Sequence, residues 1–331
     1  CDVAAIAEGE PERRQSSEID GRPLALPTLG VETLSAGGGT LARVDAAGLL
    51  QVGPESAGAA PGPVCYGRGG TQPTVTDANA ALGYLGSGAL AGSVSLDVEA
   101  ARAAIAERLA APMGLGADAA ALGVLKLIDV KMAEAIRAMA TGRGLDLRGF
   151  TLIAFGGAGP MHAARIAATL GMKGVLCPPL PGVTSALGLL EADVRHERVR
   201  AIPMMLEDAD GGAVGATVGA LADELATLLE AERFAAKDVA LIAAADLRYE
   251  GQGYELTTPI DGRAGETVDL AALRRRFDAL HRARYGHGAE DARVEIMAVR
   301  VAGVGRVAKP DYAAPSPARG PVADARIGAR A

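Results

Sequence analysis

Apolar residues recur at helical spacing along several stretches of the chain. The clearest stretch is 118–141, whose apolar stripe consists of Leu122, Leu125, Ile128, Met132, Ile136 and Met139. The same spacing predicts helices at 97–111, 213–234 and 270–285. We therefore expect long amphipathic helices that bury one face each.

Shorter apolar runs, bounded by glycine, proline and polar turn residues, predict strands. In the first part of the chain these runs cover 2–7, 31–35, 40–45 and 49–52. The segment Ala46-Ala47-Gly48 has the length and the final glycine of a three-residue hairpin loop, so this region is expected to be mostly antiparallel. Later strands are predicted at 151–155, 174–177, 239–249, 254–259 and 294–304.

The pattern of predicted elements changes near residue 203. From there the predicted strands and helices follow in an order that describes a small α+β module. A length of 331 residues suits two domains. We predict a first domain at 1–200, a second at 201–308 and a mobile tail at 309–331, which is rich in Pro, Ala, Arg and Gly.

A glycine-rich turn between a predicted strand and a predicted helix is the first candidate site. The strand at 151–155 enters Gly156-Gly157-Ala158-Gly159-Pro160, and a helix leaves at Met161. Glycine lets backbone N–H groups converge on a phosphate, and the positive N-terminal end of the helix dipole attracts the same group. Pro160 suits the first helical position, where its missing N–H is not needed. A tight turn without a ligand is the alternative. The turn is neither a P-loop nor a complete dinucleotide fingerprint.

The run Gly37-Gly38-Gly39-Thr40 is a second candidate phosphate cradle. Three consecutive glycines cost chain entropy unless positive φ or a close approach requires them. A bulge or the entry to a hairpin explains the same run, and this interpretation is favoured.

Three polar side chains are candidates for contacts with a substrate. Asp77 and Asn79 lie at the start of a predicted helix, where Thr76-Asp77 is expected to cap a helix beginning at Ala78; capping is therefore favoured over ligand binding. His162 lies in the first turn after the glycine loop, within reach of a bound phosphate or base, although a surface or capping histidine is favoured.

Composition narrows the classes of function. A net charge of −7, from 33 basic and 40 acidic side chains, argues against a nucleic-acid partner, because phosphate binding needs a concentrated basic face. The three cysteines predict no disulfide framework or zinc site, and Cys65 is expected to be buried and structural. No uninterrupted apolar run reaches the roughly 20 residues of a membrane span, and a signal-peptide pattern is missing. We expect a cytoplasmic protein without a membrane partner.

Several phrases in a fixed order resemble the hydantoinase A and 5-oxoprolinase family. They are residues 35–40 (SAGGGT), 52–59 (VGPESAGA), 61–66 (PGPVCY), 75–79 (VTDAN), 155–160 (FGGAGP), 185–189 (SALGL), 192–195 (ADVR), 248–252 (RYEGQ) and 284–287 (RYGH). The resemblance covers nearly all of residues 1–306. Gly30 and Glu32 depart from it, because members often have Asp and His at these positions, which leaves the substrate open.

The resemblance implies an α/β fold, the second half of an actin-like, Hsp70-like (RNase H-like) ATPase, followed by a small α+β domain. Asp2 is similar to the final aspartate of the second phosphate-binding hairpin of that fold, and Gly156–Pro160 to its adenosine-binding motif. Because residue 1 is Cys rather than Met and the residues from Asp2 onward already form a predicted strand, we interpret the chain as truncated at its N-terminal side. We expect the 331 residues alone to bind ATP weakly and to hydrolyse nothing.

Family members open a cyclic amide, such as 5-oxoproline or a hydantoin, with ATP. The resemblance therefore implies ATP and Mg²⁺ as cofactors and a small cyclic amide as substrate, and it identifies no catalytic residue or metal ligand. Many members share the reaction with a B-type subunit or domain, so such a partner and an oligomer are expected. A ketone carboxylase subunit is the first alternative, and a non-catalytic scaffold or inactive fragment is the second.

Overall fold

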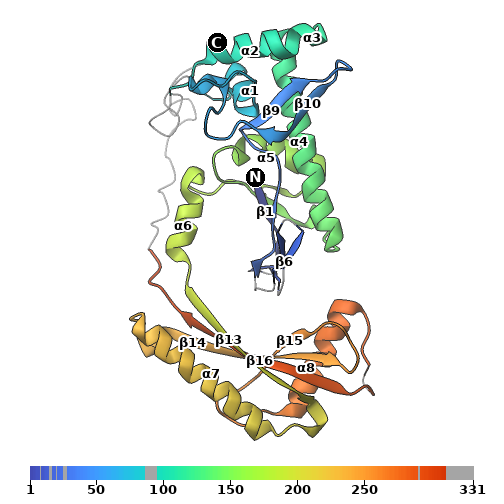
Figure 1. Ribbon diagram of the computed structural model, residues 1–331, viewed down its shortest axis with the longest axis vertical. Helices are drawn as coiled ribbons and strands as arrows, with labels where there is room; N and C mark the ends of the chain where they lie inside the picture. The colour runs from blue at the N-terminus through green and yellow to red at the C-terminus, as the bar shows by residue number, and fades with distance from the viewer. Residues whose placement is uncertain are drawn as a thin grey trace. The chain divides into compact units, whose positions relative to one another are not determined.

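The computed structural model describes residues 1–7, 9–14, 17–19, 21–24, 28–85, 95–289 and 291–310 (Figure 1). The described residues form two compact units, called unit 1 and unit 2 below. The chain passes from the first to the second between Ala186 and Leu187. The sequence placed the division after residue 200, which lies inside a strand of unit 2. Of the predicted tail at 309–331, only Lys309 and Pro310 belong to the described residues.

Unit 1 begins with a series of short antiparallel strand pairs. The pairs are β1 (Asp2–Ala4) with β8 (Val31–Thr33), β2 (Ile6–Ala7) with β3 (Glu10–Pro11), β4 (Arg13–Arg14) with β7 (Thr28–Leu29), and β5 (Ser17–Ile19) with β6 (Arg22–Leu24). The sequence predicted only the first and last of these strands, because two or three residues are too few to show an alternating pattern.

The hairpin of β9 (Thr40–Val44) and β10 (Leu50–Ser56) confirms the predicted antiparallel connection. The N–H of Asp45 donates to the carbonyl of Leu49 at 3.0 Å, which closes a three-residue loop. Gly48 has a φ of 78°, a left-handed conformation that glycine adopts without steric cost.

Helices pack on this hairpin and enclose the core of unit 1. They are α1 (Val75–Ala81), α2 (Val98–Ile105) with its π-helical continuation (Ala106–Ala110), α3 (Ala111–Met113) and α4 (Ala117–Gly142), with 3-10 turns at Val64–Tyr66 and Leu147–Gly149. The predicted stripe of α4 is buried at Leu125, Ile128, Met132 and Ile136. Both long helices predicted here are confirmed, because their apolar faces are continuous over several turns.

The predicted start of α1 was wrong. The helix begins at Val75 rather than Ala78, and its N-cap is Thr74 rather than Thr76 or Asp77. Thr74 accepts from the N–H of Asp77, and the Asp77 carboxylate accepts from the N–H of Thr74 at 2.8 Å. This reciprocal capping box satisfies two exposed amides, so it outcompetes a single cap further along the chain.

A parallel strand pair and its connecting helix complete unit 1. Strand β11 (Thr151–Ile153) pairs with β12 (Gly174–Leu176), and α5 (Gly159–Leu170) connects them. A 3-10 turn (Pro181–Val183) and α6 (Thr184–Glu191) follow, and α6 runs across the boundary between the units. The strand, glycine turn and helix predicted at 151–170 are confirmed.

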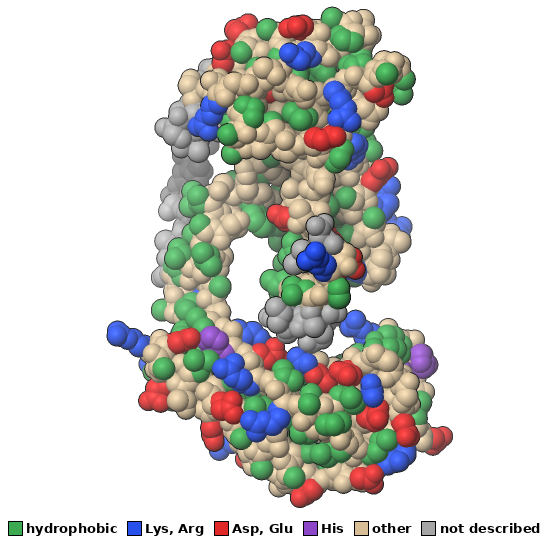
Figure 2. All heavy atoms as spheres, viewed as in Figure 1, with side chains coloured by type: hydrophobic (Ala, Val, Ile, Leu, Met, Phe, Trp, Pro, Cys, Tyr) green, Lys and Arg blue, Asp and Glu red, His purple; other side chains and the backbone are tan. Residues whose placement is uncertain are grey.

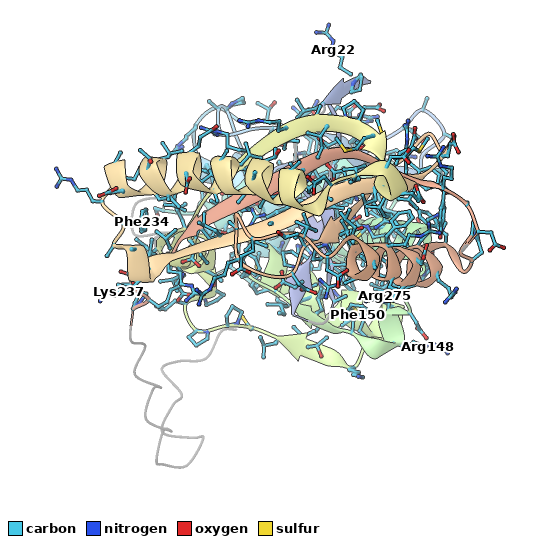
Figure 3. All side chains as sticks on the ribbon, turned by 90° about the horizontal axis from the view of Figure 1, so that it is seen from below. Arg22, Arg148, Phe150, Phe234, Lys237 and Arg275 are labelled. Carbon is cyan, nitrogen blue, oxygen red and sulfur yellow. The ribbon has the colours of Figure 1, made fainter. Side chains whose placement is uncertain are left out.

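Unit 2 is a four-stranded antiparallel sheet with two helices on one face (Figures 1 and 3). The strand order is β13 (Val194–Met205), β16 (Val294–Gly305), β14 (Val239–Tyr249) and β15 (Leu256–Pro259). The helices are α7 (Gly211–Ala231) and α8 (Leu270–Tyr285), with 3-10 turns at Leu206–Asp208 and Ala236–Asp238. Phe234, labelled in Figure 3, lies after α7 and closely approaches Gly305 at the end of β16.

Helix α7 is the one helix among the described residues that is long and apolar enough to cross a membrane. Its apolar stripe, which includes Val218, Leu221 and Leu225, is buried in the same core as Val299 and Val301 of the sheet. This packing is that of the core helix of a globular unit.

Two segments that carry the family resemblance, 248–252 and 284–287, lie close together in unit 2. Gln252 accepts the N–H of Tyr249 at 3.1 Å and places its amide nitrogen 3.1 Å from Nε2 of buried His281. The other ring nitrogen of His281 lies 2.8 Å from the carbonyl of His287, which accepts its proton. Because each polar atom of this network has a partner, these segments serve the internal structure of unit 2.

Candidate functional site

The glycine turn at Gly156–Pro160 leaves three successive backbone amides without an acceptor among the described residues. Gly156 has a φ of 87°, and its N–H donates to the carbonyl of Pro181 at 2.8 Å, which braces the start of the turn. The N–H groups of Gly157, Ala158 and Gly159 have no acceptor in the described part of the chain. They precede or begin α5, so they lie at the positive end of its dipole.

The space beside these amides is unoccupied by protein. A Cβ added at Gly157 or at Gly159 would meet no described atom within 4 Å. Backbone that a ligand can approach closely, at the start of a helix of three turns, is an arrangement suited to a phosphate group. Pro160, in the first turn of α5, lacks only an N–H that the helix does not use.

The run Gly37–Thr40 has a packing explanation of its own. A Cβ on Gly38 would lie 2.7 Å from Oγ1 of Thr76, and one on Gly39 would lie 2.9 Å from Oγ of Ser56. The buried hydroxyl of Thr40 accepts the N–H of Gly37 at 2.9 Å. Close approach to α1 and β10 therefore accounts for the glycines, and contact of this run with a nucleotide stays a prediction.

Asp2 lies at the same end of the unit as that run. Its carboxylate accepts the hydroxyl of Thr33 across the β1–β8 pair at 2.8 Å and is exposed. The backbone nitrogen of Cys1 lies 4.0 Å from the position of a Cβ on Gly37. The structure thus brings Asp2 and the run Gly37–Thr40 into one neighbourhood, as a common nucleotide contact would require.

The carboxylate of Asp77 is hydrogen-bonded within the protein. Its buried carboxylate accepts the N–H groups of Val64 at 3.2 Å, Cys65 at 2.8 Å and Thr74 at 2.8 Å, and also the Thr74 hydroxyl at 2.8 Å. Four donors occupy the lone pairs of one carboxylate. Asp77 therefore fixes the loop before α1 onto the helix and has little capacity left for a ligand.

Cys65 is buried as predicted, and burial raises the pKa of its thiol well above the usual value, with a further contribution from Asp77. Because the thiolate is the reactive form, we expect Ellman's reagent at pH 8 to titrate two thiols rapidly, the exposed Cys1 and Cys177, and all three in denaturant. A Cys65→Ala variant should give the same rapid count. Three rapid thiols in the native wild type would show that the loop around Cys65 opens readily.

Asn79 lies two residues beyond Asp77 and is also fully buried. Its amide nitrogen donates to the carbonyl of Val75 at 3.0 Å, whereas Oδ1 has no partner among the described residues. A buried acceptor without a donor costs about 1–3 kcal/mol, so this atom requires water or a ligand group.

His162 is buried, so its interpretation as a surface histidine was wrong. Its Nδ1 lies 2.6 Å from Oδ1 of Asp129, a residue of α4, and Nε of Arg165 donates to the other oxygen of the same carboxylate. The guanidinium of Arg165 also lies over the ring of Tyr84, 5.8 Å from its centre. Sequence reasoning missed Asp129 and Arg165, although a lone acid within the apolar stripe of α4 is an unusual buried charge that could have indicated them.

The two departures from the family pattern belong to an ion-pair network. Glu32 pairs with Arg14 at 2.7 Å and with Arg143 at 3.1 Å, and the hydrogen bond from Arg14 holds the pKa of Glu32 below its usual value. A Cβ on Gly30 would lie 2.2 Å from the carboxylate of Glu12, which pairs with Arg143 at 2.9 Å. The Glu32 carboxylate is thus held by two arginines, Arg14 and Arg143.

Among the described residues, polar side chains form no separate metal-binding centre. No group of three or more His, Cys, Asp or Glu side chains that could hold a metal ion occurs within the described ranges. Basic and acidic side chains are interspersed over the face of unit 2 shown in Figure 2. Unit 1 therefore carries the candidate site, at the N-terminal half of α5.

Comparison with known proteins gives matches over most of the chain. The family model for hydantoinase/oxoprolinase matches residues 1–198. The alpha subunit of caprolactamase from Pseudomonas jessenii is 36% identical over 93% of this chain, and 5-oxoprolinase 1 from Arabidopsis thaliana is 30% identical over 90%. The chain spans 45% of the first relative and 25% of the second, less than half of either length.

Two solved structures also match. The nucleotide-free structure of acetone carboxylase, whose title describes ATP-dependent carboxylation, matches 94% of this chain and 46% of its own chain with a TM-score of 0.79 and 28% identity. The structure of ATP-dependent caprolactamase from Pseudomonas jessenii matches 92% of this chain and 46% of its own, with a TM-score of 0.70 and 37% identity. The mixed α/β fold is thus shared with both.

Proposed function

Because the chain belongs to the hydantoinase/oxoprolinase family, we propose that it is the nucleotide-binding part of an enzyme that hydrolyses a cyclic amide with ATP. The observation that carries the proposal is the row of amides at Gly157, Ala158 and Gly159, which have no acceptor among the described residues, together with the open space that a Cβ on Gly157 or Gly159 would meet. We further propose that unit 1 corresponds to the second half of an actin-like ATPase fold.

The residues of the turn fit a phosphate group and would hold it through their backbone. The N–H of Gly156 is held by the carbonyl of Pro181, and the glycines that follow put no side chain in the way of a phosphate that approaches the next amides. ATP bound there would supply a phosphoryl group to the amide oxygen, which would make the carbonyl carbon electrophilic enough for water to add. The C–N bond of the ring would then break with nitrogen leaving as an amine, and the acyl phosphate would hydrolyse to a carboxylate and inorganic phosphate. No metal-binding group is found in the described part of the chain, so we propose that Mg²⁺ enters with the phosphates.

Identity and coverage together favour an amide as the substrate. Caprolactamase is named for a cyclic amide, and its alpha subunit is 36% identical to this chain over 313 residues, whereas the acetone carboxylase beta subunit is 30% identical over 293 residues. The TM-score of 0.79 with acetone carboxylase and the 39% identity over 199 residues with the acetophenone carboxylase gamma subunit support ATP-dependent carboxylation of a ketone as the second candidate function. The caprolactamase match is the better guide, because it covers 93% of this chain, whereas the acetophenone carboxylase match covers 59%.

Partners follow from the same relatives. Caprolactamase subunit alpha and acetone carboxylase beta subunit are named as parts of multi-subunit enzymes. We propose a B-type subunit or domain as the partner of this chain, in an oligomeric complex in the cytoplasm.

The test uses the complete gene product together with any partner subunit encoded beside it. We expect release of phosphate from ATP to depend on added ε-caprolactam, 5-oxoproline or hydantoin, with a ring-opened amino acid as product. A parallel reaction contains acetone and labelled bicarbonate. Fixation of the label without opening of any cyclic amide would contradict the proposed amidase function and support the carboxylase function. A lack of ATP binding would refute both proposals.

A further inference from the structure

Asp129 holds two side chains of α5 in a fixed relation. Oδ1 of Asp129 lies 2.6 Å from Nδ1 of His162, and Oδ2 accepts from Nε of Arg165. The side chains of His162 and Asp129 are 0% and 6% exposed. Because His162 and Arg165 lie one helical turn apart, they project from the same face of α5.

The carboxylate also determines which nitrogen of His162 carries the proton. An ionised carboxylate only accepts hydrogen bonds, so Nδ1 is the donor, and Nε2 of the neutral ring is left as an acceptor. Nε2 of His162 and Nη2 of Arg165 are both buried, and neither has a partner in the part of the chain that the structure describes. One carboxylate therefore positions a buried acceptor and a buried donor that both lack a counterpart.

A cyclic amide presents a donor and an acceptor on one edge. Its ring forces the amide into the cis form, so the N–H and the carbonyl oxygen lie side by side, whereas a linear trans amide presents them on opposite edges. We propose that Nε2 of His162 accepts the N–H of the cyclic amide and that Nη2 of Arg165 donates to its carbonyl oxygen. This inference rests on the proposed function and names the atoms that select the substrate.

The position of the pair on α5 supports the assignment. His162 is the fourth residue of the helix that begins at the glycine turn, and helical side chains lean toward the N-terminus. An amide held by His162 would thus lie on the side of the phosphate-binding amides. The hydrogen bond from Nη2 of Arg165 would orient the carbonyl oxygen, which is the atom that receives the phosphoryl group in the proposed function.

Nuclear magnetic resonance of the histidine rings tests this pairing directly. In the complete protein labelled with ¹⁵N-histidine, the signals that disappear in His162→Phe belong to His162, and we expect them to show the Nδ1–H tautomer. Saturating ε-caprolactam should shift Nε2 of His162. N-methylcaprolactam, which lacks the N–H, and linear N-methylacetamide should leave it unchanged. A doubly protonated ring, or a ring unaffected by caprolactam as expected if ordered water alone fills the site, would overturn the inference.

The variant Asp129→Asn separates recognition from folding. The amide of asparagine can donate to Nδ1, which moves the ring proton to Nε2 and turns the acceptor into a donor. We expect the KM for caprolactam to rise at least about tenfold, the cost of about one lost hydrogen bond, with ATP affinity unchanged. Asp118→Asn, an exposed acid at the start of the same helix, is the matched control.

The outcomes distinguish the two proposals. Wild-type protein that binds no ATP refutes the nucleotide site. Normal ATP binding combined with an unchanged caprolactam KM and ring tautomer in Asp129→Asn refutes only the role of His162 and Arg165.

Discussion

Replacing Gly157 with valine is expected to weaken ATP binding by at least about tenfold without destabilising unit 1. A Cβ at this position meets no described atom within 4 Å, and the backbone does not adopt a positive φ, so the free chain accommodates valine. The branched side chain would then fill the space that a phosphate must enter to reach the amides of Gly157 and Ala158. Each charge-assisted hydrogen bond lost costs about 1.5–3 kcal/mol.

Titration of the complete protein with a fluorescent ATP analogue measures the effect, and urea unfolding followed by circular dichroism checks the fold. Gly149→Val is the matched control, because Gly149 is also exposed, free of close neighbours and outside the turn. Both variants should unfold like the wild type. Equal ATP affinity of Gly157→Val and the wild type would mean that the turn is only a structural connection.

Patterns that repeat over many residues were predicted well from the sequence. Helices α4 and α8 show their apolar stripes over four or more turns, and the turn at Gly156–Pro160 combines an apolar strand with adjacent glycines. Both features depend on the identity of neighbours along the chain. Periodicity and local backbone chemistry are therefore enough to find them.

Features that depend on distant partners were not predicted. Strand β13 is an edge strand with an exposed, charged sequence, and only its pairing with β16 reveals it as a strand. Likewise, the spacing of residues does not show that Asp129 on α4 meets His162 and Arg165 on α5. The phosphate-binding part of the candidate site was thus accessible to sequence reasoning, whereas its polar pair required the packing of two helices.

The difference between Asp77 and Asn79 illustrates the same limit. Both residues received one interpretation from the sequence, because they stand two positions apart at the start of one predicted helix. In the structure Asp77 has four donors, whereas Oδ1 of Asn79 has none among the described residues. Only hydrogen-bond partners show which of the two is available to a ligand.

The substitution Asp77→Ala is expected to lower the stability of unit 1 by about 3–6 kcal/mol. The change removes the capping box of α1 and leaves the amides of Cys65 and Thr74 without an acceptor. Each buried group left unsatisfied costs about 1–3 kcal/mol, against a total of about 5–15 kcal/mol for a domain. The loop at 63–66 should therefore separate from α1 at low denaturant.

Hydrogen exchange measured by mass spectrometry locates the effect, since amides at 62–82 should lose protection while those of β14 and β16 in unit 2 keep theirs. Asp97→Ala is the matched control, because Asp97 caps α2 through one bond to the N–H of Ala100 at 2.9 Å and is exposed. Its expected cost is about 1 kcal/mol. If both variants lose the same stability, the bonds from Val64, Cys65 and Thr74 contribute little, and Asp77 becomes available again as a candidate for ligand binding.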